Sequence, residues 1–377
     1  MRSIPDSMVK PDYYSSIVNL SSWILDNFGV EAPHGVLNLS KGFKKIALII
    51  IDALGAKALE KIFSITSFKH IKEFQVITSV FPSTTACALT SFYTALLPAE
   101  HGMLGYILFL KEYGFLVNMI ELSPFGYERD LLKDRMEFRL QVNTIFERLE
   151  NVESFVVSPR RYMNSGLAKM LYAGAKQIGF TSVSDFVLKI RSLLKSQEKR
   201  LVVAYIPNVD SVGHRESESS YLNEAIMILK QIDGAILGKL DDDTAVVITA
   251  DHGMIRTPKK EEIWWDRKSK VMEYLDMPPG GERRMMHLYT RRPQELVEFL
   301  ESEYSDKGVF LLKEEAKELF GGTHERMGDV VLVAAGNVSY NFKYRFKEDS
   351  LKGKHGGLSP EEMLVPLIFV PGGGRHG

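Results

Sequence analysis

The stretch IALIIIDALG, residues 46–55, begins with six consecutive apolar residues and continues with the acidic Asp52 and the flexible Gly55. A short run that is apolar on both faces is typical of a parallel strand covered by helices on both sides. Four other runs have the same character, so we predict five buried parallel strands, at residues 46–51, 201–206, 245–248, 330–334 and 365–370.

Segments with helical spacing lie between these runs, at residues 86–97, 143–149, 184–194 and 221–240. Strands that alternate with helices favour an α/β fold with a layered arrangement. We therefore predict a doubly wound, mostly parallel central sheet with helices on both faces.

The stretch 256–350 interrupts this alternation just before the last strand. It is rich in charged residues and has its own helix signals at 293–302 and 313–319. We predict a small α+β cap at this point. The predicted division is a catalytic core at 1–255 and 351–371, the inserted cap at 256–350, and a flexible glycine-rich tail at 372–377.

The chain has 377 residues, and its 47 Lys and Arg residues nearly balance its 48 Asp and Glu residues. The resulting net charge of −1 argues against a nucleic-acid polymer as partner, whereas a local pocket for a small anion is compatible with it. Cys87 is the single cysteine and has no partner for an intramolecular disulfide. The N-terminus lacks the apolar segment of a signal peptide, and no membrane-spanning stretch is present, so we expect a cytoplasmic protein without a membrane partner.

Three aspartates and three histidines lie at or near the ends of predicted strands. In a doubly wound sheet these ends gather in one crevice, where carboxylates and imidazoles can bind divalent metals. One such residue alone would be explained as a helix cap or a structural histidine, but the set contains two Asp/His pairs. Six ligands are too many for one four-coordinate ion and suit two ions about 4 Å apart, bridged by an anion such as a phosphoryl group. The candidates are Asp52, Asp210, His214, Asp251, His252 and His355.

The segment FPSTTA, residues 81–86, offers three hydroxyl groups where a loop enters a predicted helix: Ser83, Thr84 and Thr85. Free backbone N–H groups and the helix dipole favour an anion at such a position. Plain helix capping by serine or threonine explains the same residues. Beside six candidate metal ligands, the hydroxyls are interpreted as candidate nucleophiles.

The order of these features resembles the alkaline phosphatase superfamily, and within it the type I phosphodiesterase and nucleotide pyrophosphatase group. The resemblance covers most of the chain and rests on the six candidate ligands, a hydroxyl near residue 85, and TALLPAEHG at residues 94–102. It implies two divalent metal ions, usually zinc, with manganese as the alternative. One metal would be held by Asp210, His214 and His355, and the other by Asp52, Asp251 and His252 together with the nucleophile oxygen.

Alignment backwards from TALLPAEHG places the nucleophile of the family on Thr85, with Thr84 as the alternative. The resemblance implies a phosphodiesterase or nucleotide pyrophosphatase that acts through a phosphothreonine intermediate. Its substrate would be a small phosphate-containing molecule, with nucleotides among the candidates.

Two positions depart from the family pattern. Cys87 stands where the group often has proline, and Tyr106 stands where it has an asparagine that contacts a nonbridging phosphate oxygen. A tyrosine can donate one hydrogen bond or offer a stacking face, so Tyr106 is predicted to bind substrate, although the nucleotide assignment is weaker. Trp264 and Trp265 are further candidates for gripping a base, but a packing role in the cap is favoured.

Three other functions compete with this interpretation. A phosphonate hydrolase of the phosphonoacetate type would differ in the bond that it cleaves. A phosphate monoesterase or a cofactor-independent phosphomutase would belong to the same superfamily, but the chain lacks the large insertion that such mutases place after the nucleophile. A binding protein with a vestigial site is disfavoured, because all seven expected reactive positions hold suitable side chains.

Overall fold

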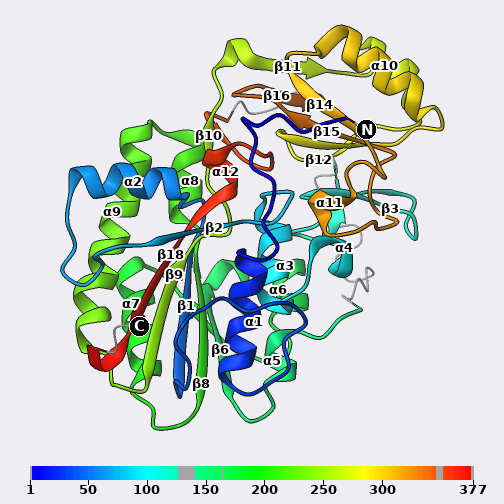
Figure 1. The fold of residues 1–377 in the computed structure, drawn as a ribbon. Coiled ribbons are helices and arrows are strands. Elements are labelled where there is room, and N and C mark those ends of the chain that lie inside the picture. The colour runs from blue at the N-terminus through cyan, green and yellow to red at the C-terminus, as the bar shows by residue number, and fades with distance from the viewer. Residues whose placement is uncertain (1, 126–140, 164, 345–350, 375–377) are drawn as a thin grey trace.

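The computed structural model describes residues 2–125, 141–163, 165–344 and 351–374 (Figure 1). β1 lies inside the central sheet, where it pairs in parallel with β8 and β9, and β6 pairs in parallel with β8 and β7. The strand order is β2 (Gln75–Thr78), β18 (Leu364–Pro371), β9 (Thr244–Thr249), β1 (Lys45–Ile51), β8 (Arg200–Ile206), β6 (Glu153–Pro159) and β7 (Lys176–Phe180).

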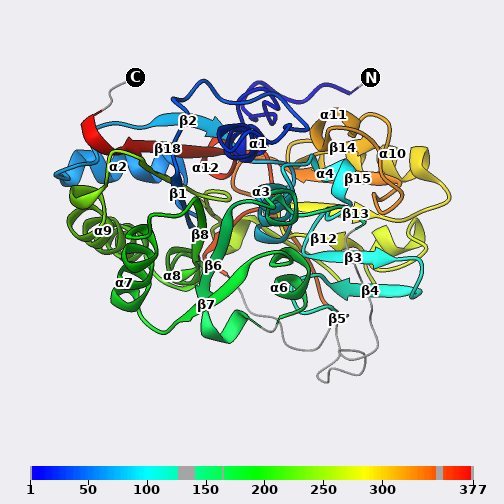
Figure 2. The ribbon, with the colours of Figure 1, turned by 90° about the horizontal axis from the view of Figure 1, so that it is seen from below.

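Helices cover both faces of this sheet, as Figure 2 shows from below. The predicted doubly wound, mostly parallel α/β fold is thereby confirmed. One face carries α2 (Ala56–Ile65), α7 (Val183–Leu194), α8 (Asn208–Arg215) and α9 (Glu218–Ala235). The other carries α1 (Ile17–Asn27), α3 (Thr85–Thr94) and α6 (Gly166–Leu171), and α5 (Ile145–Arg148) packs against α3 on this side.

Strand β18 departs from the prediction of a parallel strand. It pairs antiparallel with β9, where Ile368 lies opposite Ile248, and antiparallel with β2. The short helix α12 (Pro360–Met363) leads directly into β18 at the end of the sheet where β9 finishes, so the chain must run back. An apolar run reports burial on both faces and carries no information about strand direction.

In the described part of the chain, a second sheet of seven strands forms the cap, and its strand pairs are antiparallel. Residues 107–124, inside the range predicted as core, supply three of these strands. Their strands are short, and their partners lie far away in the sequence, so local patterns did not reveal them. The order is β14 (Gly308–Leu312), β15 (Val330–Ala334), β13 (Met285–Leu288), β12 (Gly280–Gly281), β3 (Ile107–Leu110), β4 (Phe115–Asn118) and β5 (Ser123–Pro124).

Strand β15 was predicted as a buried parallel strand, and its direction is wrong. It lies in the cap sheet, antiparallel to β13 and β14. Val331 and Val333 pack in the main apolar core, whereas Val330 and Leu332 pack in a separate cap core beneath α10 (Pro293–Tyr304). Because both faces are covered, the strand has the continuous apolar composition of a buried parallel strand.

The remaining predicted helices are present with shifted bounds. Residues 293–302 form α10, and only the end of 313–319 is helical, as α11 (Lys317–Phe320). Segment 221–240 is divided between α9 and the 3₁₀ turn η2 (Leu237–Lys239). The other short elements are α4 (Pro98–His101), η1 (Arg160–Tyr162), η3 (Lys259–Glu261), η4 (Lys270–Glu273), η5 (Gly372–Gly374), and the strand pairs β10 (Ile255–Arg256) with β17 (Gly353–Lys354) and β11 (Glu262–Trp265) with β16 (Ser339–Phe342).

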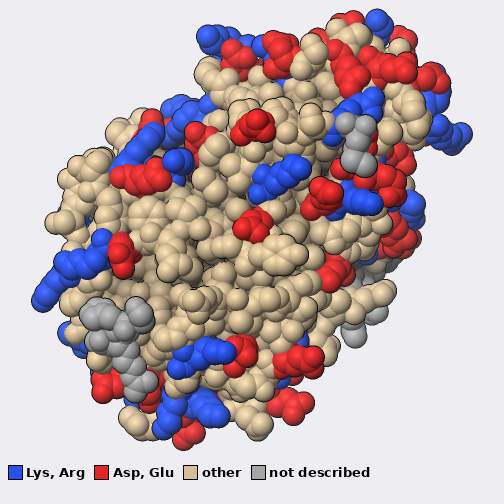
Figure 3. All heavy atoms as spheres, viewed as in Figure 1, with Lys and Arg blue, Asp and Glu red and all other residues tan. Residues whose placement is uncertain are grey.

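Of the predicted tail, residues 372–374 form η5, and residues 375–377 lie outside the described part of the chain. Among the described helices, none has the length and apolar character needed to span a membrane. On the face shown in Figure 3, acidic and basic side chains are interspersed, in keeping with the balanced net charge.

Candidate metal centre

The carboxyl ends of three neighbouring strands carry most of the predicted ligands. Asp52 follows β1, and Asp251 and His252 follow β9. On the other side of β1, the chain leaves β8 and enters α8, which holds Asp210 and His214 one helical turn apart. His355 follows β17, so the last ligand comes from the return of the chain from the cap.

Two glycines allow the turns after β1 and β9 to lie close together. A Cβ atom on Gly253 would stand 1.9 Å from the carbonyl oxygen of Glu361, and one on Gly55 would stand 2.9 Å from the same oxygen. Only glycine fits such an approach of backbone to backbone. The turns that present Asp52 and His252 are therefore packed directly against α12.

Asp52, Asp251 and His252 form one compact group of buried side chains, whose ligand atoms lie within 4.8 Å of one another. His252 Nε2 is 3.5 Å from Asp52 Oδ1 and 3.5 Å from Asp251 Oδ2. The other oxygen of Asp251 accepts hydrogen bonds from the backbone N–H groups of Ala53 and His252, at 3.1 and 3.0 Å. One carboxylate oxygen thus fixes the side chain, and the other faces the group.

Asp210, His252 and His355 form a second group within the same limit of 4.8 Å. His355 Nε2 is 3.7 Å from Asp210 Oδ1, and its ring stacks on that of His252 with the centroids 3.9 Å apart. His214 Nε2 lies 3.2 Å from Asp210 Oδ1, but its ring centroid is 5.2 Å from that of His355. His252 therefore belongs to both groups, and His214, which was predicted beside Asp210 and His355, adjoins the second group through Asp210.

The three histidines are oriented in the same way. Each Nδ1 makes a hydrogen bond with a backbone carbonyl oxygen: His214 with Gly353 at 2.8 Å, His252 with Gly253 at 2.9 Å, and His355 with Ser83 at 3.2 Å. A carbonyl oxygen can only accept, so each Nδ1 carries the proton and donates. In the neutral ring Nε2 then has a free lone pair, which is the arrangement of metal-binding histidines.

The cluster brings several carboxylates together in a buried place, where a cation would stabilise their charged forms. Burial and the charges of Asp251 and Asp210 raise the pKa of Asp52 well above its usual range. Burial also opposes ionisation of Asp210, but the charge of His214 lowers its pKa to about 2. Among the described residues, Asp52 Oδ1, Asp210 Oδ1 and Asp251 Oδ2 are buried oxygens without a hydrogen-bond partner.

Three buried carboxylate oxygens therefore face the Nε2 atoms of neighbouring histidines. Such a set is costly unless a cation fills it. Mixed nitrogen and oxygen ligands of this kind fit zinc, and fit manganese as well.

The candidate nucleophiles face in different directions. α3 begins at Thr85, and Thr85 Oγ1 lies 3.2 Å from His252 Nε2, at the edge of the candidate metal group. Thr84 Oγ1 instead donates to Glu282 Oε1 of the cap at 2.6 Å, and Ser83 Oγ donates to the carbonyl oxygen of Gly357 at 2.8 Å. Of the three hydroxyls in FPSTTA, that of Thr85 is the one beside the ligands.

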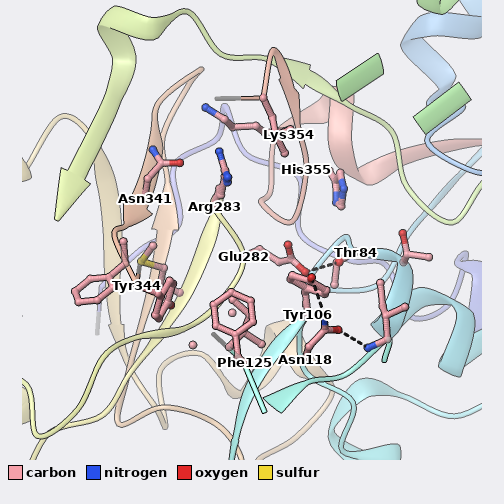
Figure 4. A pocket seen from close by; sticks show the side chains of 18 of the residues that line it. Thr84, Tyr106, Asn118, Phe125, Glu282, Arg283, Asn341, Tyr344, Lys354 and His355 are labelled. Atoms are coloured by element: carbon pink, nitrogen blue, oxygen red, sulfur yellow. Dashed lines mark hydrogen bonds between the residues drawn. The ribbon is translucent and has the colours of Figure 1, made fainter. Parts of the chain in front are cut away.

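A cavity of about 620 Å³ lies between core and cap, and Figure 4 shows the side chains around it. Its core wall includes Thr85 and the candidate ligands Asp210, His214 and His355. Its cap wall includes Tyr106, which directly precedes β3. The cap wall also includes Asn118, Ser123, Phe125, Glu282, Arg283 and Tyr344, none of which was predicted from the sequence.

The tryptophans considered for base binding do not line this cavity. Trp265 is 2% exposed in the cap core, and Trp264 Nε1 donates to Glu262 Oε2 at 3.1 Å. The cavity has instead an aromatic pair, Phe125 and Tyr344, whose ring centroids are 4.8 Å apart in an edge-to-face arrangement. The favoured packing role for Trp265 is therefore confirmed.

Glu282 connects the cap to the nucleophile segment. The same oxygen, Oε1, accepts from Thr84 Oγ1 at 2.6 Å and from the backbone N–H of Tyr106 at 2.9 Å. Burial raises the pKa of Glu282 to about 7, against the effect of these two hydrogen bonds. The partners lie 198 and 176 residues away, so no local motif could have indicated this residue.

Two residues further on, Arg284 connects the cap to the His355 loop. Arg284 and Glu362 form a fully buried ion pair at 2.8 Å. Glu362 also accepts from the backbone N–H groups of Gly357 at 2.8 Å and Ser359 at 3.3 Å, so it holds the loop that follows His355. The turn at residues 282–284, between β12 and β13, thus contacts both the nucleophile segment and the loop that follows His355.

A family model described as type I phosphodiesterase / nucleotide pyrophosphatase matches residues 46–358 of the chain. Among curated proteins, no sequence matches.

Solved structures with the same fold include murine ectonucleotide pyrophosphatase / phosphodiesterase 5, at 17% identity and a TM-score of 0.60, with 86% of this chain and 87% of that chain covered. An inactive form of the mouse protein in complex with AMP has 16% identity and a TM-score of 0.59, and covers 86% and 87%. Phosphonoacetate hydrolase from Sinorhizobium meliloti 1021, in complex with phosphonoacetate, has 19% identity and a TM-score of 0.62, and covers 86% and 89%. At these identities the likeness is one of fold.

Proposed function

Because the chain belongs to the type I phosphodiesterase / nucleotide pyrophosphatase family of phosphoester hydrolases, we propose that it is a metal-dependent phosphodiesterase with Thr85 as its nucleophile. The observation that carries the proposal is the position of Thr85 Oγ1, 3.2 Å from His252 Nε2 at the edge of six clustered ligands. Its substrate would be a small phosphate ester, with nucleotides among the candidates.

Two divalent metals, zinc or manganese, would be held by the six clustered residues. Bound there, they would neutralise phosphoryl charge and lower the pKa of the attacking hydroxyl. The buried carboxylate oxygens that face the histidine Nε2 atoms support this assignment. The ligands named from the family pattern are Asp210, His214 and His355 for one ion and Asp52, Asp251 and His252 for the other.

The residues of the chain would act in two stages. Thr85 Oγ1 attacks phosphorus, the ester bond to the leaving alcohol breaks, and a phosphothreonine forms. Water then attacks the same phosphorus, the bond from phosphorus to Thr85 Oγ1 breaks, Thr85 regains its hydrogen, and the phosphate monoester is released. The start of α3 favours an anion beside Thr85, because its first N–H groups have no partner within the helix. Tyr106 lines the same cavity and is the proposed substrate-binding residue.

The test uses protein stripped of metal and resupplied with zinc or manganese. We expect metal-dependent hydrolysis of bis-p-nitrophenyl phosphate in preference to p-nitrophenyl phosphate. A preference for the monoester would indicate a phosphatase or mutase. Cleavage of phosphonoacetate without turnover of either ester would indicate a phosphonate hydrolase.

A metal-content control accompanies this test. Asp210→Asn should reduce the metal bound per chain, measured by atomic absorption, because it removes an unpaired charged ligand. Unchanged metal content in this variant would count against the proposed ligand set.

A further inference from the structure

Tyr106 is held at three points along the cap wall of the cavity (Figure 4). Its backbone N–H donates to Glu282 Oε1 at 2.9 Å, and its carbonyl oxygen accepts from the N–H of Met119 at 2.8 Å. Its hydroxyl oxygen accepts from Asn118 Nδ2 at 2.9 Å. The ring therefore has a defined position on the wall, which a side chain held only at its backbone would not have.

The orientation of the Asn118 amide decides the role of the Tyr106 hydroxyl. Asn118 Oδ1 accepts from the backbone N–H groups of Ile120 at 3.0 Å and Glu121 at 3.2 Å. Both partners can only donate, so the amide oxygen must face them and the amide nitrogen must face Tyr106. The hydroxyl oxygen accepts that bond, and no described residue accepts the hydroxyl hydrogen.

The hydroxyl keeps its hydrogen under ordinary conditions. Burial, with the charges of Glu282 and Glu121, raises the pKa of Tyr106 to about 12. Near neutral pH the phenol is therefore protonated and can donate one hydrogen bond. An anionic phosphate ester has nonbridging oxygens that accept such bonds strongly.

One carboxylate oxygen links the backbone of Tyr106 to the nucleophile segment. Glu282 Oε1 accepts from Thr84 Oγ1 at 2.6 Å and from Tyr106 N at 2.9 Å, and Thr84 directly precedes Thr85. Glu282 thus ties the backbone of the residue that carries the donor to the residue next to the candidate nucleophile, and Tyr106 and Thr85 line the same cavity.

We propose that Tyr106 donates a hydrogen bond to a phosphoryl oxygen of the substrate, and that Asn118 and Glu282 are positioning residues that aim this donor. The inference rests on the proposed phosphodiesterase function and makes it more specific. It selects the donor role for Tyr106 over the stacking role, and it adds two residues from distant parts of the chain.

The test is a double-mutant cycle with Tyr106→Phe and Asn118→Asp. The first change removes the hydroxyl alone. The second keeps an oxygen for Ile120 and Glu121 but offers Tyr106 an acceptor, so the hydroxyl would donate to the new carboxylate instead of the substrate. Ser123→Asp is the control for added charge, because Ser123 lies opposite Asn118 in the β4–β5 ladder and lines the same cavity.

Each of the two changes should lower kcat/KM for bis-p-nitrophenyl phosphate by about 10- to 100-fold, the usual worth of a hydrogen bond to a charged group. When Tyr106→Phe is already present, adding Asn118→Asp should lower kcat/KM only by the smaller factor that Ser123→Asp causes in the unaltered protein. The affinity for inorganic phosphate, measured by calorimetry, should fall in parallel, while circular dichroism and the thermal midpoint stay unchanged.

If the double variant lost the product of the two single reductions in kcat/KM, the positioning role of Asn118 would be overturned. The same would follow if Asn118→Asp lowered kcat/KM no more than Ser123→Asp does. Full activity in Tyr106→Phe would overturn the donor role itself. Phosphate affinity tests the donor even without turnover. If the unaltered protein hydrolyses no phosphate ester, the proposed function fails, whereas an unchanged phosphate affinity in Tyr106→Phe makes the present inference fail.

Discussion

The core wall and the cap wall of the cavity draw their residues from the chain in different ways. On the core wall, Asp210 and His214 lie on α8, the helix that follows the parallel strand β8. The neighbouring ligands Asp52, Asp251 and His252 follow the parallel strands β1 and β9. Each ligand is thus adjacent in sequence to the element that positions it. On the cap wall, Tyr106 and Glu282 meet across 176 residues, through an antiparallel sheet assembled from two distant segments.

We infer from this difference that the core wall carries the reacting groups and that the cap wall selects the substrate. Parallel strands place their ends at one edge of a sheet whatever the rest of the chain does, so the ligand cluster depends on a few local signals. The cap wall depends on register between remote strands, and its residues are bound to one another as well as to the core. We expect substitutions on the core wall to abolish the reaction and substitutions on the cap wall to tune it.

The largest effect should come from the nucleophile itself. Thr85→Ala should lower kcat by on the order of 10³-fold or more, because it removes the attacking oxygen, while leaving the metal content near normal. Thr84→Ala should cost much less, since Thr84 Oγ1 faces Glu282. Single-turnover kinetics and atomic absorption on both variants measure this contrast. The reverse ranking would move the nucleophile by one residue.

Breaking the clamp between cap and core should have the next largest effect. Arg284→Met leaves Glu362 buried without its partner, which should destabilise the fold by about 3–5 kcal/mol. It should also weaken metal binding by roughly 10- to 100-fold, because Glu362 holds the His355 loop. Urea midpoints of the metal-free protein and chelator competition measure the two effects separately.

Lys45→Met is the matched control for this clamp. Lys45 is 1% exposed and pairs with Asp241 at 2.8 Å and Asp243 at 3.1 Å, at the end of β1 opposite Asp52. Its loss should lower stability without changing metal affinity. If both variants changed metal affinity equally, the effect would be one of general destabilisation, and Arg284 would have no specific role at the site.

The contrast between the walls also explains what the sequence could and could not predict. The doubly wound sheet was evident because residues 46–51 are apolar on both faces, and its strand-end ligands followed from it. The directions of β18 and β15 did not follow, since double burial looks the same in a parallel strand and in an antiparallel strand that is covered on both faces. No local sequence pattern marked Glu282, Asn118 and Phe125 as cavity residues, because they reach the cavity only through the pairing of cap strands that are distant in the sequence.

The smallest expected effect concerns the aromatic side chains of the cap. Phe125→Ala should raise KM for a diester with an aromatic leaving group by about 2- to 10-fold, because an aromatic contact contributes about 0.5–1.5 kcal/mol beyond its buried area. Trp264→Ala is the matched control, since its ring lies outside the cavity, beneath Lys343 Nζ at 5.8 Å, and should leave KM unchanged. Comparing aromatic with methyl esters separates ring contact from general damage. A larger effect for Trp264 than for Phe125 would mean that the substrate extends beyond the cavity toward β11, and the cap wall described here would be only part of the recognition surface.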